Sequence, residues 1–226
     1  MMRFRHILLI AGLCPFVAMS AMGGFVSYQD VDRNVSAFIG DSGGMFQDAQ
    51  DGYWYSTIEQ GNESSMVRAH QQSNLAISSL SFESDTQAVG TPFQGERYSG
   101  STLNTTLSLD SAAVVDLHWT YLLEMEGAAA GGAGMRITSA EGDSLFDIDF
   151  QFEGELSATS EMELVAGSYL VEMYLGSSVE PTGTGEVVTE FEVAMYFSSV
   201  PAPGALGVLA VTIFAGRTRR RGPRRR

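Results

Sequence analysis

The sequence predicts an all-β protein whose body, residues 21–199, is an antiparallel β-sandwich of jelly-roll type. Apolar and polar residues alternate with a period of two through residues 103–197, which is typical of strands with one buried and one solvated face. Turn-forming residues separate these runs. No convincing amphipathic helix occurs between residues 21 and 100, and a body of about 180 residues is long enough to bury its own core.

The clearest strands lie in the C-terminal half, where each run predicts which side chains face the core. Residues 103–109 and 156–164 show the pattern more weakly, and breaks fall at 127–134, 141–143, 166–168 and 181–185. The predicted core faces comprise Val115, Leu117, Trp119, Tyr121 and Leu123; Phe146, Ile148, Phe150 and Phe152; Tyr169, Val171, Met173 and Leu175; and Phe191, Val193, Met195 and Phe197.

The N-terminal half predicts fewer strands, at residues 35–39, 53–58 and 75–82. The segment Tyr53-Trp54-Tyr55 can direct only one of its two faces to a core, so at least one aromatic ring is expected to point outward. Tyr and Trp rings combine a large apolar surface with a polar group, which suits them to ligand contact. These residues are therefore the candidate platform for a polysaccharide.

Charge is distributed unevenly along the chain. All 13 basic residues are Arg, and only four of them lie among residues 21–200, which hold all 27 acidic residues. The body therefore carries a net charge of 4 − 27 = −23. Such a charge repels nucleic acid, so DNA and RNA are excluded as partners of the folded part. Because the single cysteine is Cys14, the body has no disulfide and no cysteine-bound zinc.

The first 20 residues have the three parts of a secretory signal peptide, including a short apolar helix. Arg3 and Arg5 form the positive region, residues 7–17 form the apolar region, and small residues end the segment. The apolar run is too short for a spanning anchor. We therefore expect passage through the export translocase and cleavage by signal peptidase between Ser20 and Ala21.

The last 27 residues, 200–226, have three ordered parts. A proline motif breaks any preceding strand, an apolar stretch follows over 205–215, and an arginine block ends the chain. The 17 residues from 200 to 216 are at the lower limit for a transmembrane helix, whose positive flank stays in the cytoplasm. The motif is Val200, Pro201, Ala202, Pro203 and Gly204, and the block contains Arg217, Arg219, Arg220, Arg221, Arg224, Arg225 and Arg226.

This arrangement resembles the C-terminal sorting segment of bacterial PEP-CTERM proteins, in which a Pro-x-Pro motif precedes one transmembrane helix and an Arg-rich tail. The family has Glu between the prolines, where this chain has Ala202. The resemblance implies transient retention in the inner membrane and cleavage near the proline motif by an exosortase-type enzyme. It also implies a place in an envelope that carries exopolysaccharide.

Two segments resemble catalytic serine motifs but lack a base. Residues 40–44 read Gly-Asp-Ser-Gly-Gly, as in trypsin-like proteases, yet the only upstream histidine is His6 in the signal peptide. Residues 142–145 read Gly-Asp-Ser-Leu, as in a lipase and esterase family, yet no histidine follows His118. We therefore expect no catalytic residues.

Calcium is the only cofactor for which the sequence offers ligands. Residues 30–34 begin like a calcium loop, but Val35 stands where an EF-hand needs Gly. Asp147 and Asp149 share a strand face with Glu153, a spacing that a solvated acidic face also produces. We therefore expect no cofactor and no metal ligands.

Together these features predict a non-enzymatic protein of the cell envelope or extracellular matrix. It would be exported through the inner membrane, held by a single-pass tail and associated with exopolysaccharide. One alternative is that the sandwich is a polysaccharide-binding module, for which exposed aromatic residues are needed and for which Trp54 with Tyr53 and Tyr55 is the candidate platform. A secreted hydrolase is the more remote alternative.

Overall fold

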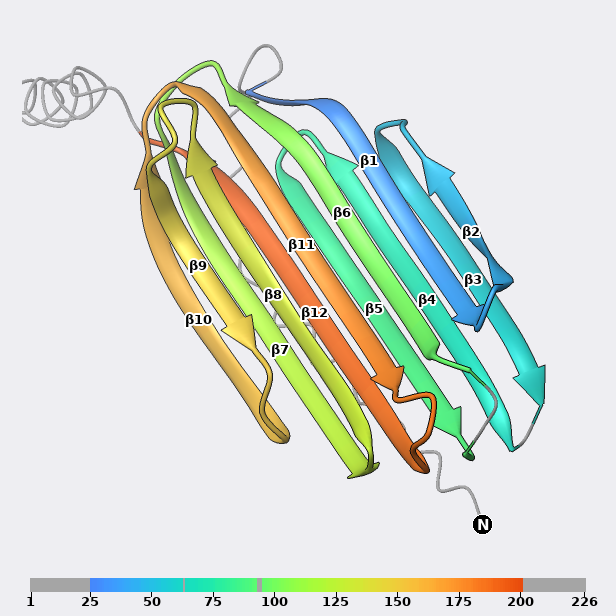
Figure 1. Ribbon diagram of the computed structural model, residues 1–226. Coiled ribbons are helices and arrows are strands. Elements are labelled where there is room, and N and C mark those ends of the chain that lie inside the picture. The colour runs from blue at the N-terminus through green and yellow to red at the C-terminus, as the bar shows by residue number, and fades with distance from the viewer. Residues whose placement is uncertain (1–24, 63, 93–94, 201–226) are drawn as a thin grey trace, which may run out of the picture.

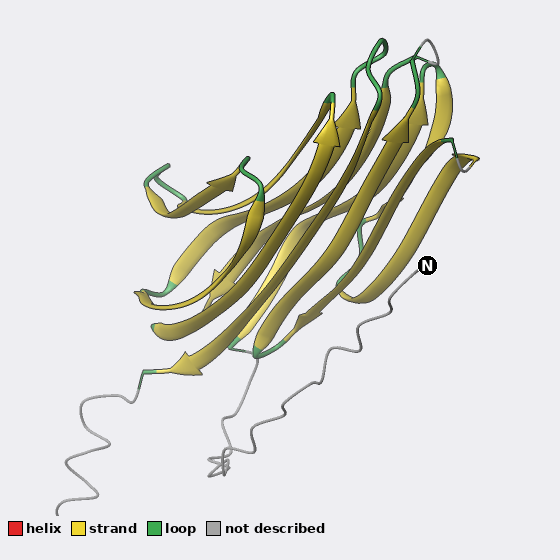
Figure 2. Ribbon diagram, turned by 90° about the horizontal axis from the view of Figure 1, so that it is seen from below, coloured by secondary structure: helices red, strands yellow, loops and turns green. Residues whose placement is uncertain are grey.

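The computed structural model describes residues 25–62, 64–92 and 95–200, and these residues form two antiparallel sheets of six strands each, packed face to face (Figures 1 and 2). No helix occurs in these ranges. The predicted all-β antiparallel sandwich is confirmed, whereas its jelly-roll type stays a prediction. The predicted signal helix and transmembrane helix lie outside the described residues, and no helix within them is long and apolar enough to span a bilayer.

The strands alternate between the sheets several times along the chain. Sheet A contains, in spatial order, β2 (Ser42–Asp48), β1 (Val26–Ile39), β6 (Arg97–Leu109), β11 (Gly167–Val179), β8 (Ala129–Ser139) and β9 (Ser144–Phe150). Sheet B contains β10 (Gly154–Leu164), β7 (Ala113–Gly127), β12 (Gly185–Ser199), β5 (Ser79–Gly90), β4 (Ser65–Ala76) and β3 (Gly52–Asn62). Consecutive strands pair as hairpins in β1–β2, β3–β4–β5 and β8–β9.

The core lies between the sheets and is built from every second residue of the long strands. On β7, Leu117 and Tyr121 are buried while His118 and Thr120 between them are exposed. Trp119 is half-buried and packs on the core. The predicted core faces of β7, β11 and β12 are therefore confirmed. Phe152 differs, because β9 ends at Phe150 and leaves Phe152 49% exposed.

Two sequence predictions about strand boundaries are wrong. Residues 75–82 are not one strand, because a tight turn at Ile77 and Ser78 separates β4 from β5. The glycine-rich segment 127–134 is not only a turn, since β8 begins at Ala129 and runs through it. Strands also cover most of the described part of residues 25–100, well beyond the three short segments predicted there.

One part of the interior is polar, which the alternation of apolar residues does not reveal. The hydroxyl of Ser177 lies 2.8 Å from Thr86 Oγ1 and 2.9 Å from Thr189 Oγ1, so residues of both sheets share hydrogen bonds across the sandwich. Arg97 is fully buried and donates to Ser65 Oγ at 3.1 Å. Buried polar groups need such partners, and here strands β4, β5, β6, β11 and β12 supply them to one another.

Candidate functional site

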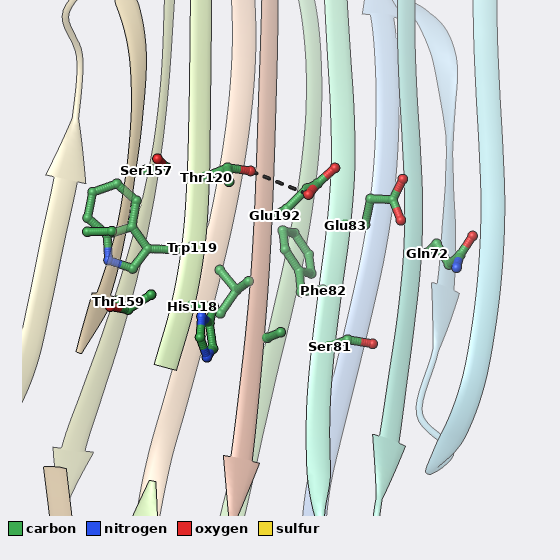
Figure 3. Close-up of a pocket in the computed structure, with 13 residues that line it drawn as sticks. Gln72, Ser81, Phe82, Glu83, His118, Trp119, Thr120, Ser157, Thr159 and Glu192 are labelled. Carbon is green, nitrogen blue, oxygen red and sulfur yellow. Dashed lines mark hydrogen bonds between the residues drawn. The ribbon is translucent and has the colours of Figure 1, made fainter. Parts of the chain in front are cut away.

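A groove of about 550 Å³ crosses the outer face of sheet B, and we call it the B-face groove (Figure 3). Five strands contribute to it: β4, β5, β12, β7 and β10. Its lining comprises Gln72, Ser81, Phe82, Glu83, His118, Trp119, Thr120, Ser157, Ala158, Thr159, Glu192, Val193 and Ala194. The groove is open to solvent, so a ligand can reach it from outside the sandwich.

Strand register places the polar lining residues in one row. Ser157 pairs with Thr120 and Thr120 with Glu192, while Glu192 pairs with Glu83 and Glu83 with Gln72. Gln72 in turn pairs with Tyr55 on the edge strand β3. Because neighbouring strands lie about 4.8 Å apart, this row forms a continuous band of hydrogen-bonding groups across the sheet.

Small side chains create the hollow, and they lie in the row two residues along the strands from the polar row. Ala194 on β12 pairs with Ser81 on β5, and His118 pairs with Ala194 from the other side. Residues two apart on a strand share a face, so Ala194 and Ser81 lie beside Glu192 and Glu83 on the outer surface. The short pair leaves room over the centre of the sheet.

The carboxylates of the groove lack a basic partner. Burial raises the pKa of Glu192, and repulsion from Glu83 raises it further. The hydroxyl of Thr120 donates to Glu192 at 3.4 Å, and this hydrogen bond lowers the pKa. Burial also raises the pKa of Glu190, together with the charges of Asp85 and Glu192. No Arg is among the described residues that line the groove. The site is therefore an acceptor-rich surface that disfavours anions.

Aromatic rings stand near both ends of this band. The ring of Tyr55, which is 58% exposed, lies 5.0 Å from the ring of His70 between centroids. The ring of His118 lies edge-on to Tyr196, with centroids 5.9 Å apart. Tyr53 is 63% exposed, so the predicted outward direction of an aromatic residue in Tyr53-Trp54-Tyr55 is found for both tyrosines. Trp54 instead packs against the core.

Beside the groove, three ionisable side chains form a cluster that sequence reasoning did not predict. Asp85 accepts from Arg68 at 2.9 Å, and its other oxygen lies 2.9 Å from His70 Nδ1. Burial alone would raise the pKa of Asp85, but the hydrogen bonds and charges of His70 and Arg68 outweigh burial and lower it. Only the pairing of β4 with β5 brings the three together, so no local sequence signal marks them.

The raised pKa of Glu192 predicts a pH dependence of stability. A carboxyl whose pKa is higher in the folded than in the unfolded protein stabilises the fold when protonated, and this contribution is lost as the pH rises through the folded pKa. Glu192 and Glu190 both have a pKa above the ordinary carboxyl value of 4.5, so each loses its stabilising contribution as the pH rises above that value. The melting temperature should therefore fall between pH 5 and pH 7. Asp85 has a lowered pKa and therefore stabilises the fold when ionised, and this contribution is lost only as the pH falls towards or below its ordinary pKa of 3.8.

Glu192→Gln tests this expectation, because it removes one of the two groups. The substitution should raise the melting temperature at pH 7 by about 1–2 °C and flatten its dependence on pH. Glu141→Gln, in the exposed turn between β8 and β9, is the matched control with the same charge change. Thermal melts from pH 5 to pH 7 measure both, and identical pH profiles for wild type and Glu192→Gln would contradict the assignment.

Most of the residues predicted for sorting lie outside the described residues, including Ser20, Ala21, Pro201, Ala202, Pro203, Gly204 and the tail arginines from Arg217 to Arg226. Val200 is described: it is 41% exposed, and its amide donates to the carbonyl of Ala112 at 3.2 Å. The last strand ends directly before it, at Ser199. The proline motif thus begins where the sandwich ends.

The two serine motifs lie in hairpins of sheet A. Ser42 begins β2, directly after a turn in which Gly40 has a φ of 56°. Ser144 begins β9, after a turn in which Gly142 has a φ of 91°. Both turns use a left-handed backbone that favours glycine, which explains the motifs as turn sequences.

The acidic residues that were considered for calcium have other partners in the structure. Asp147 pairs with Arg136 at 3.1 Å, and Asp149 accepts from the amide of Gln151 at 3.2 Å. Residues 30–34 belong to β1, with a bulge at Asp30, rather than to a loop. Among the described residues, no group of three His, Cys, Asp or Glu side chains is placed to hold a metal ion.

No protein family model matches the sequence, and no curated protein matches it. Fifteen chains of solved structures match, and three of these, with TM-scores of 0.21 to 0.26, show how distant the similarity is. The enzymatically active domain of tailspike protein 4 of bacteriophage CBA120 has 10% identity and a TM-score of 0.26, over 70% of this chain and 19% of that chain. TmCBM61 in complex with β-1,4-galactotriose has 9% identity and a TM-score of 0.21, over 65% of this chain and 88% of that chain.

A structure of infectious bursal disease virus strain Gx has 7% identity and a TM-score of 0.21, over 81% of this chain and 59% of that chain. The present chain thus spans about a fifth of the tailspike chain and about three fifths of the viral one. At such scores the similarities carry no argument about function. Function has to be inferred from the geometry of the B-face groove.

Proposed function

We propose that this chain is an exported, non-enzymatic protein of the cell envelope or extracellular matrix whose β-sandwich binds polysaccharide in the B-face groove. The observation that carries the binding proposal is the row from Ser157 through Thr120, Glu192, Glu83 and Gln72, which spans five strands at the open groove. Export and tail anchoring rest on the terminal segments 1–20 and 200–226.

The chemistry of the groove fits a chain of neutral sugars. Carboxylates such as Glu83 and Glu192 accept strong hydrogen bonds from hydroxyl groups, and Gln72 and Thr120 can both donate and accept. The flat rings of Tyr55 and His118 near the two ends offer apolar contact to the faces of sugar rings. Because the body carries net negative charge, acidic polysaccharides such as alginate are repelled.

Native gel electrophoresis in gels that contain a polysaccharide tests the proposal. We expect at least one of dextran, hydroxyethyl cellulose and β-1,4-galactan to slow the wild-type protein, while alginate does not. Ala194→Trp fills the hollow of the groove on its solvent side, and Tyr55→Ala removes a ring. Each should weaken binding at the B-face groove by about tenfold, which corresponds to the loss of roughly one good contact there.

The control for these variants is Glu141→Gln, whose exposed position in the β8–β9 turn leaves the groove intact. Circular dichroism of each variant establishes that the sandwich still forms. If none of the polysaccharides slows the wild-type protein, or if Ala194→Trp and Tyr55→Ala bind as wild type does, the groove is not a polysaccharide site.

One specific observation favours a second candidate, a glycoside hydrolase. Glu83 on β5 and Glu192 on β12 are directly paired neighbours on the outer face of sheet B inside the groove, and the pKa of Glu192 is raised. Glycosidases use two carboxyl groups, one of them protonated as a general acid. The same polysaccharides, incubated with the protein and assayed for new reducing ends, separate the candidates. Products that disappear in Glu83→Gln and Glu192→Gln would establish the hydrolase, and their absence favours binding alone.

A further inference from the structure

The outer face of sheet A, on the opposite side of the sandwich, carries a second hollow. We call it the A-face furrow; its volume is about 330 Å³. Gly176 on β11 and Gly132 on β8 line it, and Gly176 also pairs with Gly100 on β6, so three glycines lie side by side on neighbouring strands. Tyr98 and Tyr174 line it, each two residues before one of these glycines. In Figure 1 these strands form the middle of the front sheet.

The glycines let both tyrosine rings lie along the sheet. A Cβ atom at Gly100 would collide with the hydroxyl of Tyr98 and would lie 2.7 Å from its Cζ, so the ring of Tyr98 lies over Gly100. A Cβ atom at Gly134 would lie 2.5 Å from Tyr174 Cζ, so that ring lies over β8. The two residues are 42% and 41% exposed. Each ring therefore leaves surface free for a ligand.

The two rings are spaced along the furrow. Tyr98 pairs with Ser178, and Tyr174 pairs with Thr102, so their positions differ by four residues along the strands. At about 3.3 Å per residue, this separates their Cα atoms by about 13 Å along the strand direction. The Tyr98 ring lies over Gly100, which is two positions nearer Tyr174, so the rings are closer to each other than these Cα atoms and one ligand can contact both.

Polar groups surround this aromatic pair. Thr102 and Ser178 offer hydroxyls, and Asp149 and Gln151 reach the furrow from the β9 side, where the Gln151 amide donates to Asp149 at 3.2 Å. Small residues lie between these donors and acceptors; on β11, for example, Gly176 lies between Tyr174 and Ser178. Ligand sites of this kind combine apolar surface with a few convergent polar groups.

We propose that the A-face furrow is a second polysaccharide site, so that one molecule bridges two polysaccharide strands through its opposite faces. The inference deepens the proposed function, because it takes neutral polysaccharide as the ligand class from the B-face groove. The charge of the surroundings supports the same class. Asp147, Asp149 and Glu172 line the adjoining hollow against the single Arg136, so an acidic chain is disfavoured.

The two sites open on opposite faces of the sandwich, so one short oligosaccharide cannot occupy both. The B-face groove opens on the outer surface of sheet B and the A-face furrow on the outer surface of sheet A, with the buried core between them. Packed sheets lie about 10 Å apart, and their outer side chains add to this thickness. A protein with this arrangement cross-links a polysaccharide network, whereas a single-faced module only decorates it.

Gly176 provides a clean means of blocking the furrow. A Cβ atom there would meet its nearest neighbours, Ser99 O and Tyr98 Cε2, at the ordinary distance of 3.7 Å. Gly176→Leu should therefore fill the furrow without distorting the strand. Tyr98→Ala with Tyr174→Ala is the complementary change, since it removes the rings and leaves the furrow open. Ala194→Trp blocks the opposite face alone.

The experiment uses the full-length protein and oligosaccharides cut from whichever of dextran, hydroxyethyl cellulose and β-1,4-galactan slows it most in the gel assay. Calorimetric titration of the wild type should reveal binding at both faces. Gly176→Leu and Tyr98→Ala/Tyr174→Ala should each halve the stoichiometry, as should Ala194→Trp, and Gly176→Leu/Ala194→Trp should bind about tenfold or more weakly than any of these. Mixing with the long polysaccharide should raise turbidity for wild type only.

The outcomes separate this inference from the function on which it rests. If the furrow variants keep wild-type stoichiometry and turbidity while Ala194→Trp abolishes binding, the second site is refuted and the B-face groove stands. If only the furrow variants lose binding, the furrow is a polysaccharide site but bridging is refuted, as is the B-face groove. If the wild type binds none of the probes, both proposals fail.

Discussion

Replacing the arginines of the C-terminal block with neutral residues is expected to release the protein from the membrane. In the proposed anchor, the 17 residues from 200 to 216 are barely long enough to span a bilayer, so the positive charges after them would be needed to hold the segment and to keep its end in the cytoplasm. The change covers Arg217, Arg219, Arg220, Arg221, Arg224, Arg225 and Arg226. Most newly made protein should then appear in the soluble exported fraction.

Fractionation of cells shortly after pulse labelling measures this release before any processing enzyme acts on the proline motif. Neutralising Arg136 is the matched control, because it is an exposed arginine of the sandwich that pairs only with Asp147 at the surface. Its removal should leave retention unchanged. Equal retention of the wild type and the tail variant would contradict the anchor, and with it the proposed resemblance to sorting segments.

The alternation of apolar and polar residues predicted the strands that have one buried and one solvated face. It could do so because side chains that point between the sheets must be apolar, while those that point to water are polar. Leu117 and Tyr121 on β7 are buried between the sheets, as their spacing implies. The pattern fails where two such strands meet without a glycine or proline. Leu75 and Leu80 are both buried, and the residues between them turn at Ile77 and Ser78, so a hairpin was predicted as one strand.

The candidate sites were harder to predict, because register rather than local sequence assembles them. Glu83 and Glu192 are 109 positions apart in the chain yet directly paired in sheet B. Small residues such as Ala194 and Gly176 carry no chemical signal in a sequence, although they form the hollows. Of the residues near the B-face groove, only the aromatic segment 53–55 was predicted to contact a ligand, and Tyr55 indeed lies at its edge.

Buried arginine was also not predicted, since a count of charges does not say which side chains lie inside the sandwich. Arg33 on β1 is fully buried and lies 3.1 Å from Asp48 at the end of β2. Its other nitrogen donates to the carbonyl of Gly52 at 2.7 Å. Arg33 therefore ties together the two ends of the connection along which the chain passes from sheet A to sheet B.

Asp48→Asn is expected to destabilise the protein by about 2–3 kcal/mol, because it removes the carboxylate that pairs directly with the buried guanidinium of Arg33 and leaves only the weaker attraction of Asp51. The value lies below the usual range for fully buried pairs, since Asp48 is 22% exposed and water screens part of the charge. Burial lowers the pKa of Arg33, but an arginine stays protonated in proteins. The lost attraction therefore cannot be relieved by releasing a proton.

Replacing both partners, as Arg33→Met with Asp48→Leu, should cost less than Asp48→Asn alone, because no charge then remains buried. The exposed pair of Arg136 and Asp147 is the control, with an expected loss of at most about 0.5 kcal/mol when Asp147→Asn breaks it. Urea denaturation of the purified protein gives these free energies of unfolding. If Asp48→Asn costs no more than Asp147→Asn, Arg33 is not held by this pair, and the crossing between the sheets must be stabilised by the backbone alone.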